Sequence, residues 1–273
     1  MKLGLMQGRL LPKFNGRFQA HPLGYWQKEF QLAKELDLDL IEFILDFNDL
    51  ELNPLMTYEG INEIKLIAKK TGVSVQTICA DYFMQYPLVD QKYTKDSLYV
   101  LKRLIRSAES LGVSDIVLPF VDESSLNGED DFDRLVGVLK PVLETLNGKS
   151  INLSLETDLN PPDFLNLLKK LDHKNVKVNY DIGNSAALGY DMEEEFETYG
   201  DMISDIHLKD RNFKGGSVKF GEGDSDFKKL FSLIKRSDYK GPLIMQSYRD
   251  EEGLEIFKEQ LSWIKRIMNS DRE

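Results

Sequence analysis

The sequence predicts an α/β fold, a single (β/α)8 barrel. Its 273 residues are close to the ~250 that such a barrel usually needs. Eight short apolar runs alternate with longer segments of helical periodicity, which is the pattern of repeated βα units. Dividing 273 residues by eight leaves about 34 per unit, enough for a strand, a crossover helix and two loops. No linker rich in Pro, Gly or Ser interrupts the chain, so residues 1–273 are expected to form one domain.

The expected strands are short and mostly apolar, and each is followed by a polar turn or loop. They are Lys2–Gln7, Leu40–Ile44, Ser74–Cys79, Asp115–Pro119, Asn152–Glu156, Val176–Asp181, Ile203–Lys209 and Leu243–Ser247. The segment from Leu11 to Gly24 is expected to be a long first loop.

The expected helices carry apolar residues at three- and four-residue spacing and therefore bury one face each. Gly112 follows one of them as a C-terminal cap, and Pro161 with Pro162 opens another, where a missing N–H costs nothing. They are Tyr25–Leu36, Tyr58–Lys70, Tyr93–Leu111, Phe132–Leu146, Phe164–Leu171, Asp226–Ser237 and Leu254–Met268. The acidic run Asp191–Glu197 is expected to be the solvated face of a further helix.

Composition excludes several classes of function. Lys and Arg number 35 and Asp and Glu 46, so the net charge of −11 repels polyanions and disfavours nucleic-acid binding. No run approaches the ~18 consecutive apolar residues of a membrane span. The single cysteine, Cys79, excludes an intrachain disulfide and a four-thiolate zinc site, and fits a reducing compartment. We therefore expect a cytoplasmic protein with a small-molecule substrate.

Four late strands end in residues that can bind a metal: Glu156, Asp181, His207 and Gln246. In a βα barrel the carboxyl ends of the strands meet at one mouth, so these side chains are expected to converge. They lie 25, 26 and 39 positions apart, consistent with one ligand from each successive βα unit. This set of oxygen and nitrogen donors suits Mn²⁺, Co²⁺, Mg²⁺ or Zn²⁺. Because it contains no thiol, it favours the harder ions, with Mn²⁺ as the first choice.

The motifs around these residues resemble those of the xylose-isomerase-like TIM barrel superfamily of sugar and sugar-phosphate isomerases and epimerases. Ketose 3-epimerases and hexulose-phosphate or pentulose-phosphate epimerases are the members most similar to this sequence. The motifs are LSLETD with Glu156, NYDIGN with Asp181, DIHLKDR with His207, FGEGDSDF at residues 220–227, and PLIMQSYRD with Gln246. The resemblance implies a divalent metal held by Glu, Asp, His and Glu. It also implies that the two glutamates transfer protons on opposite faces of the sugar, and that the chain pairs as a homodimer.

The sequence departs from the family pattern at Gln246, where the second glutamate is expected. An amide oxygen can bind a metal, but an amide is not a general base near neutral pH. Glu156 is then the remaining catalytic base, and one base suffices to move a proton between adjacent carbons through a metal-stabilised enediolate. Asp181 would supply negative charge, and His207 would bind as a neutral ligand. The substitution shifts the expectation from an epimerase toward an isomerase.

Basic residues cluster after the last two expected strands, a region that binds substrate phosphate in many barrels. They are Lys209, Arg211, Lys214, Lys219 and Arg249. Arg211 is the first candidate for an anion contact because a guanidinium grips phosphate through two hydrogen bonds, and Lys209 is the second. The alternative is a solvated basic loop.

Three further polar residues are candidates for the mouth. Gln7 and Glu42 lie at or near the ends of the first two strands and are expected to line it. Glu222 either replaces the missing glutamate or only orients its glycine-containing loop.

Three other functions remain as alternatives. A cyclic-polyol dehydratase of the same fold would use the same metal but eliminate water. A catalytically impaired sugar-binding barrel would have lost activity together with the second glutamate. A nuclease similar to endonuclease IV is disfavoured, because its three-zinc site needs more histidines than the three present and because the net charge opposes DNA.

Overall fold

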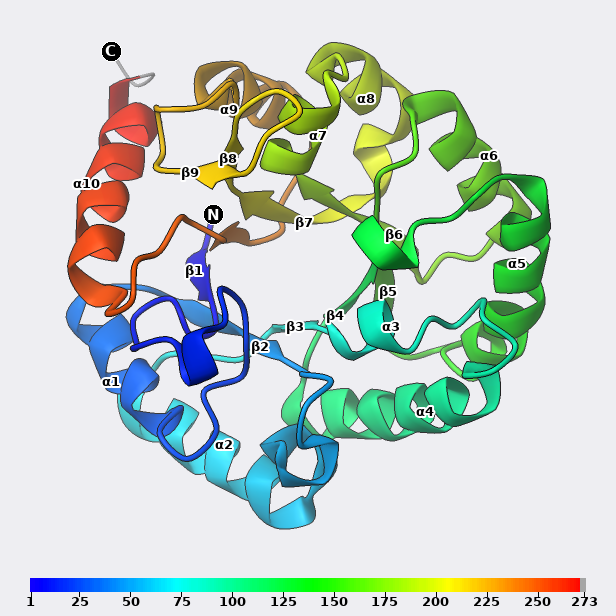
Figure 1. Cartoon of the computed structure of the whole chain (residues 1–273), viewed down its shortest axis with the longest axis horizontal. Coiled ribbons are helices and arrows are strands. Elements are labelled where there is room, and N and C mark those ends of the chain that lie inside the picture. Colours follow the sequence, from blue (N-terminus) through cyan, green and yellow to red (C-terminus); the bar gives the residue numbers. More distant parts are fainter. Residues whose placement is uncertain (271–273) are drawn as a thin grey trace.

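Eight parallel strands close into a barrel in the computed structural model, which describes residues 1–270. Helices surround the barrel, and the chain begins inside this ring of helices with β1 (Figure 1). The strands follow one another around the barrel in the order β1, β10, β7, β6, β5, β4, β3, β2. They are β1 (Leu3–Met6), β2 (Leu40–Ile44), β3 (Thr77–Cys79), β4 (Asp115–Phe120), β5 (Asn152–Thr157), β6 (Val176–Asp181), β7 (Ile203–Leu208) and β10 (Leu243–Met245). The predicted (β/α)8 fold is confirmed.

The seven amphipathic helices predicted from periodicity are present. They are α1 (Gln27–Glu35), α2 (Tyr58–Thr71), α4 (Thr94–Leu111), α5 (Glu129–Glu144), α6 (Pro161–Leu171), α9 (Phe227–Arg236) and α10 (Leu254–Ser270). Helix α5 begins three residues earlier than expected, with three acidic residues in a first turn that favours negative charge. No helix within residues 1–270 is both long and apolar enough to cross a membrane.

Shorter elements fill the connections. Three more helices are α3 (Tyr82–Gln85), α7 (Ile182–Leu188) and α8 (Met192–Tyr199), and β8 (Asp210–Arg211) pairs antiparallel with β9 (Ser217–Val218). Single 3-10 turns are η1 (Phe14–Gly16), η2 (Leu50–Leu52), η3 (Pro54–Met56), η4 (Asp122–Ser124) and η5 (Gly200–Met202). The predicted acidic helix is α8, but its Glu195 is buried and accepts hydrogen bonds from Tyr180, Ser185 and Tyr199. The expectation that its acidic run is solvated is therefore wrong at Glu195.

Successive side chains of each strand point alternately toward the helices and into the barrel interior. On β2, Leu40, Glu42 and Ile44 share one face, and all three are fully buried. Leu40 and Ile44 belong to a small apolar cluster separate from the main core, together with Met6, Cys79, Val117 and Ile244. Glu42 is thus a carboxylate inside the barrel, where it needs partners to offset the cost of burial.

Candidate metal and substrate site

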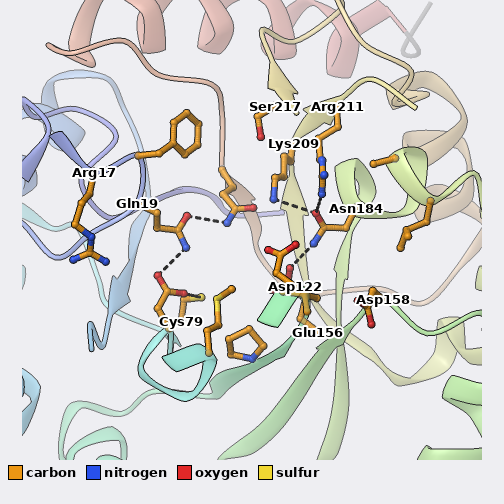
Figure 2. Close-up of a pocket in the computed structure, with 18 of the residues that line it drawn as sticks. Arg17, Gln19, Cys79, Asp122, Glu156, Asp158, Asn184, Lys209, Arg211 and Ser217 are labelled. Atoms are coloured by element: carbon orange, nitrogen blue, oxygen red, sulfur yellow. Dashed lines mark hydrogen bonds between the residues drawn. The ribbon is translucent and has the colours of Figure 1, made fainter. Parts of the chain in front are cut away.

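A cavity of about 520 Å³ opens where the carboxyl ends of the strands meet. Glu156 lies at its base, the first loop supplies one wall, and α7 with the β8–β9 hairpin supplies the other (Figure 2). The first loop contributes Arg9, Arg17 and Gln19, and the end of β3 contributes Cys79 and Asp81 next to them. The other wall includes Asn184, Lys209, Arg211, Lys214 and Ser217. The location agrees with the general rule for active sites in this fold.

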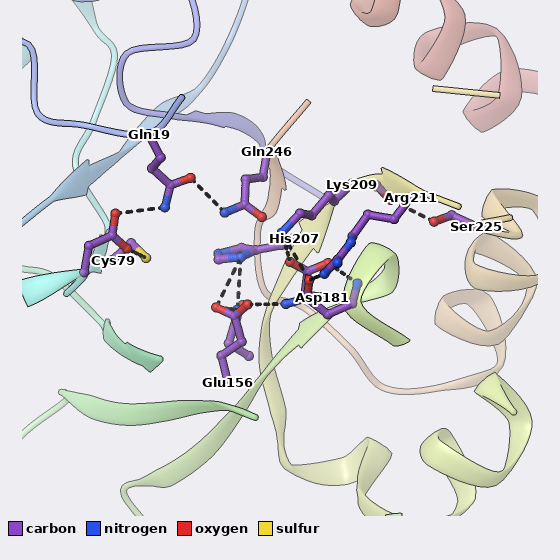
Figure 3. A network of polar contacts seen from close by, with 12 residues as sticks. Gln19, Cys79, Glu156, Asp181, His207, Lys209, Arg211, Ser225 and Gln246 are labelled. Carbon is purple, nitrogen blue, oxygen red and sulfur yellow. Dashed lines mark hydrogen bonds and ion pairs between the residues drawn. The ribbon is translucent and has the colours of Figure 1, made fainter. Parts of the chain in front are cut away.

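Glu156, Asp181 and His207 converge at the base of this cavity. One ligand atom from each of the three lies within 4.8 Å of those of the other two, and all three residues are buried. They come from adjacent strands β5, β6 and β7, and Asp181 is the register partner of His207. The three side chains predicted to converge are therefore adjacent in space (Figure 3).

Gln246 follows β10 and is also buried. Its Nε2 donates to Gln19 Oε1 at 3.0 Å, whereas its Oε1 has no hydrogen-bond partner. A buried acceptor without a partner costs free energy, and a cation ligated by the oxygen would offset that cost. In Figure 3, Gln246 and Glu156 lie on opposite sides of the His207 ring. Two carboxylates, an imidazole and a partner-free amide oxygen fit a divalent cation.

Residues inside the barrel fix the orientation of His207. Its Nε2 lies 2.8 Å from Glu42 Oε1. Burial and the neighbouring Glu42 carboxylate raise the pKa of Asp205 well above its usual range. Glu42 can accept the His207 Nε2–H, and Nδ1 is the ring nitrogen on the side of Glu156, 3.8 Å from its Oε2 and 3.1 Å from Asn179 Nδ2. Glu42, expected at the mouth, lies beneath it and orients His207.

The surroundings of the cluster raise the pKa values of both Glu156 and His207. Burial raises the pKa of Glu156 to about 7, and the charge of Asp181 adds to the effect. Burial acts to lower the pKa of His207, but the carboxylates of Glu42, Glu156 and Asp181 outweigh it and raise that pKa to about 9. A carboxylate with a pKa near 7 can both take up and return a proton at neutral pH.

The NYDIGN motif positions two of these groups. Asp181 caps α7 by accepting the Asn184 backbone N–H at 2.9 Å, and the Asn184 side chain donates to Glu156 Oε1 at 2.7 Å. Lys209 Nζ lies 3.3 Å from Asp181 Oδ2. A side chain at Gly183 would bring its Cβ within 2.8 Å of Lys209 Cγ, so only glycine leaves room for this lysine.

Lys209, Arg211 and Lys214 make one wall of the cavity cationic. Arg211 is held in place because its Nε and Nη2 donate to the Gly215 carbonyl and its Nη1 donates to Asn184 Oδ1. The FGEGDSDF loop supports this wall by wrapping around the buried Asp210 carboxylate, which accepts the backbone N–H groups of Gly221, Gly223 and Ser225. A Cβ at Gly223 would lie 2.3 Å from Asp210 Oδ1, which explains the glycine.

Three predicted substrate contacts do not lie along the cavity. The Gln7 side-chain oxygen accepts from the Ile44 backbone N–H and contacts His21 Nδ1. Arg249 is buried and donates to the carbonyls of Gly8 and Leu11, so it fastens the first loop. Glu222 is exposed on the FGEGDSDF loop. We do not include these three residues in the site that we propose.

The structure adds lining residues that the sequence analysis missed. Arg9, Arg17 and Gln19 come from the first loop, whose sequence carries no periodic pattern. Asp81 comes two residues after β3, and this position after a strand is the signal that identified the other ligands. Cys79 ends β3 and also lines the cavity.

Comparisons with known proteins identify the family. A family model described as "Xylose isomerase-like TIM barrel" matches residues 30–267. The L-ribulose-5-phosphate 3-epimerase UlaE of Salmonella heidelberg (strain SL476) is 27% identical over 270 residues, which covers 92% of this chain and 93% of that protein.

Solved structures share the fold at low sequence identity. The D-psicose 3-epimerase from Clostridium cellulolyticum H10, solved with D-tagatose, has a TM-score of 0.75 and 17% identity, covering 100% of this chain and 98% of that one. A xylose isomerase-like TIM barrel protein from Mycobacterium smegmatis, solved in complex with magnesium, has a TM-score of 0.74 and 18% identity, covering 98% and 97%. From the closed barrel, the converging motifs and the family match, we conclude that the chain belongs to the xylose isomerase-like TIM barrel family.

Proposed function

We propose that this protein is a divalent-cation-dependent isomerase or epimerase of a sugar or sugar phosphate, with Glu156 as the base. The observation that carries the proposal is the convergence of Glu156, Asp181 and His207 at the base of a cavity that Gln246, whose amide oxygen has no partner, also lines. These four residues would hold the cation, with Mn²⁺ as the first choice. A bound cation would polarise a substrate carbonyl and acidify the neighbouring C–H.

The residues at the base of the cavity would have different roles in proton transfer and cation binding. Glu156, with a pKa near 7, removes and returns the proton, and it is held in place because Asn184 donates to its Oε1 and Asn179 donates to its Oε2. Asp181 and His207 hold the cation, and Asn184 also orients Arg211. Gln246 would contribute its amide oxygen to the cation and cannot take up a proton.

The cationic wall favours an acidic substrate. Lys209, Arg211 and Lys214 face a cavity whose 520 Å³ fits a small molecule. Arg211 and Lys209 would contact a phosphate or carboxylate group of the sugar. The 27% identical relative is named for a ketose phosphate, which supports a phosphorylated substrate.

The first test is Mn²⁺ binding by chelator-stripped protein, followed by electron spin resonance. We expect one tightly bound ion, lost in Asp181→Ala and kept in the control Asp158→Asn, which changes a carboxylate of the same cavity outside the cluster. Hydrogen–deuterium exchange of ketoses and ketose phosphates with the loaded protein then identifies the substrate. If the unmodified protein binds no Mn²⁺, the proposal is wrong and a sugar-binding barrel without catalysis is the better description.

A further inference from the structure

Four polar side chains form a continuous hydrogen-bonded chain along the wall that faces Glu156 across the cavity. Arg9 Nη2 donates to Gln19 Oε1 at 2.9 Å, and Gln246 Nε2 donates to the same oxygen at 3.0 Å. Gln19 Nε2 donates to Asp81 Oδ2 at 2.9 Å. Figure 3 shows Gln19 between Cys79 and Gln246.

At one end of this series of hydrogen bonds, the Arg9 side chain can only donate hydrogen bonds. The Arg9 guanidinium is fully buried, and its Nη1 donates to the Phe18 carbonyl. Burial and the charge of Arg249 lower the pKa of Arg9 to about 9, so the group remains a cation at neutral pH. A guanidinium has no acceptor, so the atom of Gln19 that faces it must be the amide oxygen.

The end at Asp81 can only accept when its carboxylate is ionised. Asp81 Oδ1 accepts a hydrogen bond from the Cys79 thiol at 3.1 Å, and Oδ2 accepts one from the Gln19 amide nitrogen. If the Gln19 amide were rotated by half a turn, its nitrogen would face the donors of Arg9 and its oxygen would face the carboxylate. Both ends therefore select the same orientation of Gln19.

The orientation of Gln19 in turn determines that of Gln246. Gln19 Oε1 is a hydrogen-bond acceptor, so Gln246 must direct its Nε2 donor toward it. The Oε1 atom of Gln246 is then directed away from Gln19. That oxygen is one of the buried side-chain atoms without a hydrogen-bond partner in residues 1–270. A Gln246 amide rotated by half a turn would place two acceptors against each other and aim an NH₂ group at the cation ligands.

We propose that Arg9, Gln19 and Asp81 are positioning residues that hold the Gln246 amide with its oxygen toward a cation bound by Glu156, Asp181 and His207. The inference rests on the proposed function, because it presupposes a cation at that cluster. This positioning role explains how an amide can serve as a cation ligand. A carboxylate can bind a cation through either of its two oxygens, whereas an amide binds only when its neighbours turn its oxygen, and not its nitrogen, toward the cation.

The test compares Gln19→Met in two backgrounds, the unmodified chain and Gln246→Glu. Gln19 is only partly buried, so the chain should tolerate methionine, and thermal unfolding checks each variant. In the unmodified chain, Gln19→Met should weaken Mn²⁺ binding about tenfold, since residues that orient metal ligands change affinity by roughly 10- to 100-fold. In the Gln246→Glu background, the same change should leave Mn²⁺ affinity within about twofold, because a carboxylate needs no such selection.

Gln85→Met, on an exposed position of α3, is the control for the substitution itself, and Gln19→Ser replaces Gln19→Met if the latter does not fold. Equal Mn²⁺ affinity with and without Gln19, or an equal loss in both backgrounds, would overturn the positioning role while leaving the cation site intact. Failure of the unmodified protein to bind Mn²⁺ would overturn the proposed function and this inference together.

Discussion

The two sides of the cavity differ in their ionisable groups. The acidic side, formed by Glu156, Asp181 and His207, has pKa values raised to about 7 at Glu156 and about 9 at His207. The amide side, formed by Gln19 and Gln246, is backed by Arg9 and by the first loop, where burial lowers the pKa of His21 to about 4. The acidic side therefore contains the candidate proton-transfer group, Glu156, whereas the amide side holds groups in place. We infer that proton transfer is one-sided.

The largest effect is expected on the acidic side, at Glu156. Glu156→Gln keeps an oxygen that can bind the cation but removes the base, and positioned general bases contribute about 10²- to 10⁴-fold. Exchange of the substrate C–H with solvent deuterium should fall by that factor, while Mn²⁺ binding is largely kept. Asp158→Asn is the matched control, since it changes a carboxylate elsewhere in the cavity. Undiminished exchange in Glu156→Gln would assign the base to another residue.

The next effect concerns the first loop behind the amide side. His21 is buried against Trp26 and Phe43, and its pKa of about 4 lies below the 6.5 expected when unfolded. Between pH 6.5 and 4 the unfolded chain binds a proton that the folded chain does not, so stability is complete above pH 6.5 and falls as the pH drops. The loss reaches about 3 kcal/mol near pH 4.

Urea unfolding of the unmodified chain and of His21→Phe, at pH 7.5 and at pH 4.5, measures this loss. Phenylalanine keeps the ring packing but cannot titrate, so the free energy of unfolding of His21→Phe should fall less between these two pH values. An identical fall in both proteins would show that His21 is not the group responsible.

A smaller effect is expected at the cationic wall. Arg211→Ala removes a guanidinium that lines the cavity, and charge-assisted hydrogen bonds contribute about 1.5–3 kcal/mol. The KM for a phosphorylated ketose should rise by about 10- to 100-fold, and the KM for its unphosphorylated analogue should change little. Lys219→Ala is the control, because Lys219 pairs with Glu259 outside the cavity. Equal changes with both substrates would argue against anion recognition.

The same contrast explains which parts could be predicted from the sequence. The acidic side was predictable because its residues end apolar strands, and the barrel closes all strand ends onto one mouth. The amide side depends on Arg9 and Gln19, which lie in a first loop without periodicity. Their roles come from tertiary contacts with Gln246 and Asp81 that no local pattern records.

The fold itself was predictable wherever an element was long. The seven amphipathic helices and the eight strands were all predicted, because each repeats its apolar period several times or forms a clear apolar run. Helix α7 and the β8–β9 hairpin were missed because seven residues, or two per strand, are too few to establish a period. For Arg249 the charge suggested an anion contact, whereas in the structure its two terminal nitrogens donate to the backbone carbonyls of Gly8 and Leu11.

The smallest effect is expected at Gln246, where one substitution gives the amide side a carboxylate like that of the acidic side. Gln246→Glu places a carboxylate on the amide side, which should strengthen Mn²⁺ binding by about tenfold, a gain of about 1.4 kcal/mol. It should also introduce a second base, so inversion at a carbon beside the carbonyl should appear or increase relative to isomerisation. Chiral product analysis in D₂O measures both reactions in one experiment. If neither Mn²⁺ affinity nor product distribution changes, Gln246 does not reach the cation, and the one-sided chemistry inferred from its amide loses its basis.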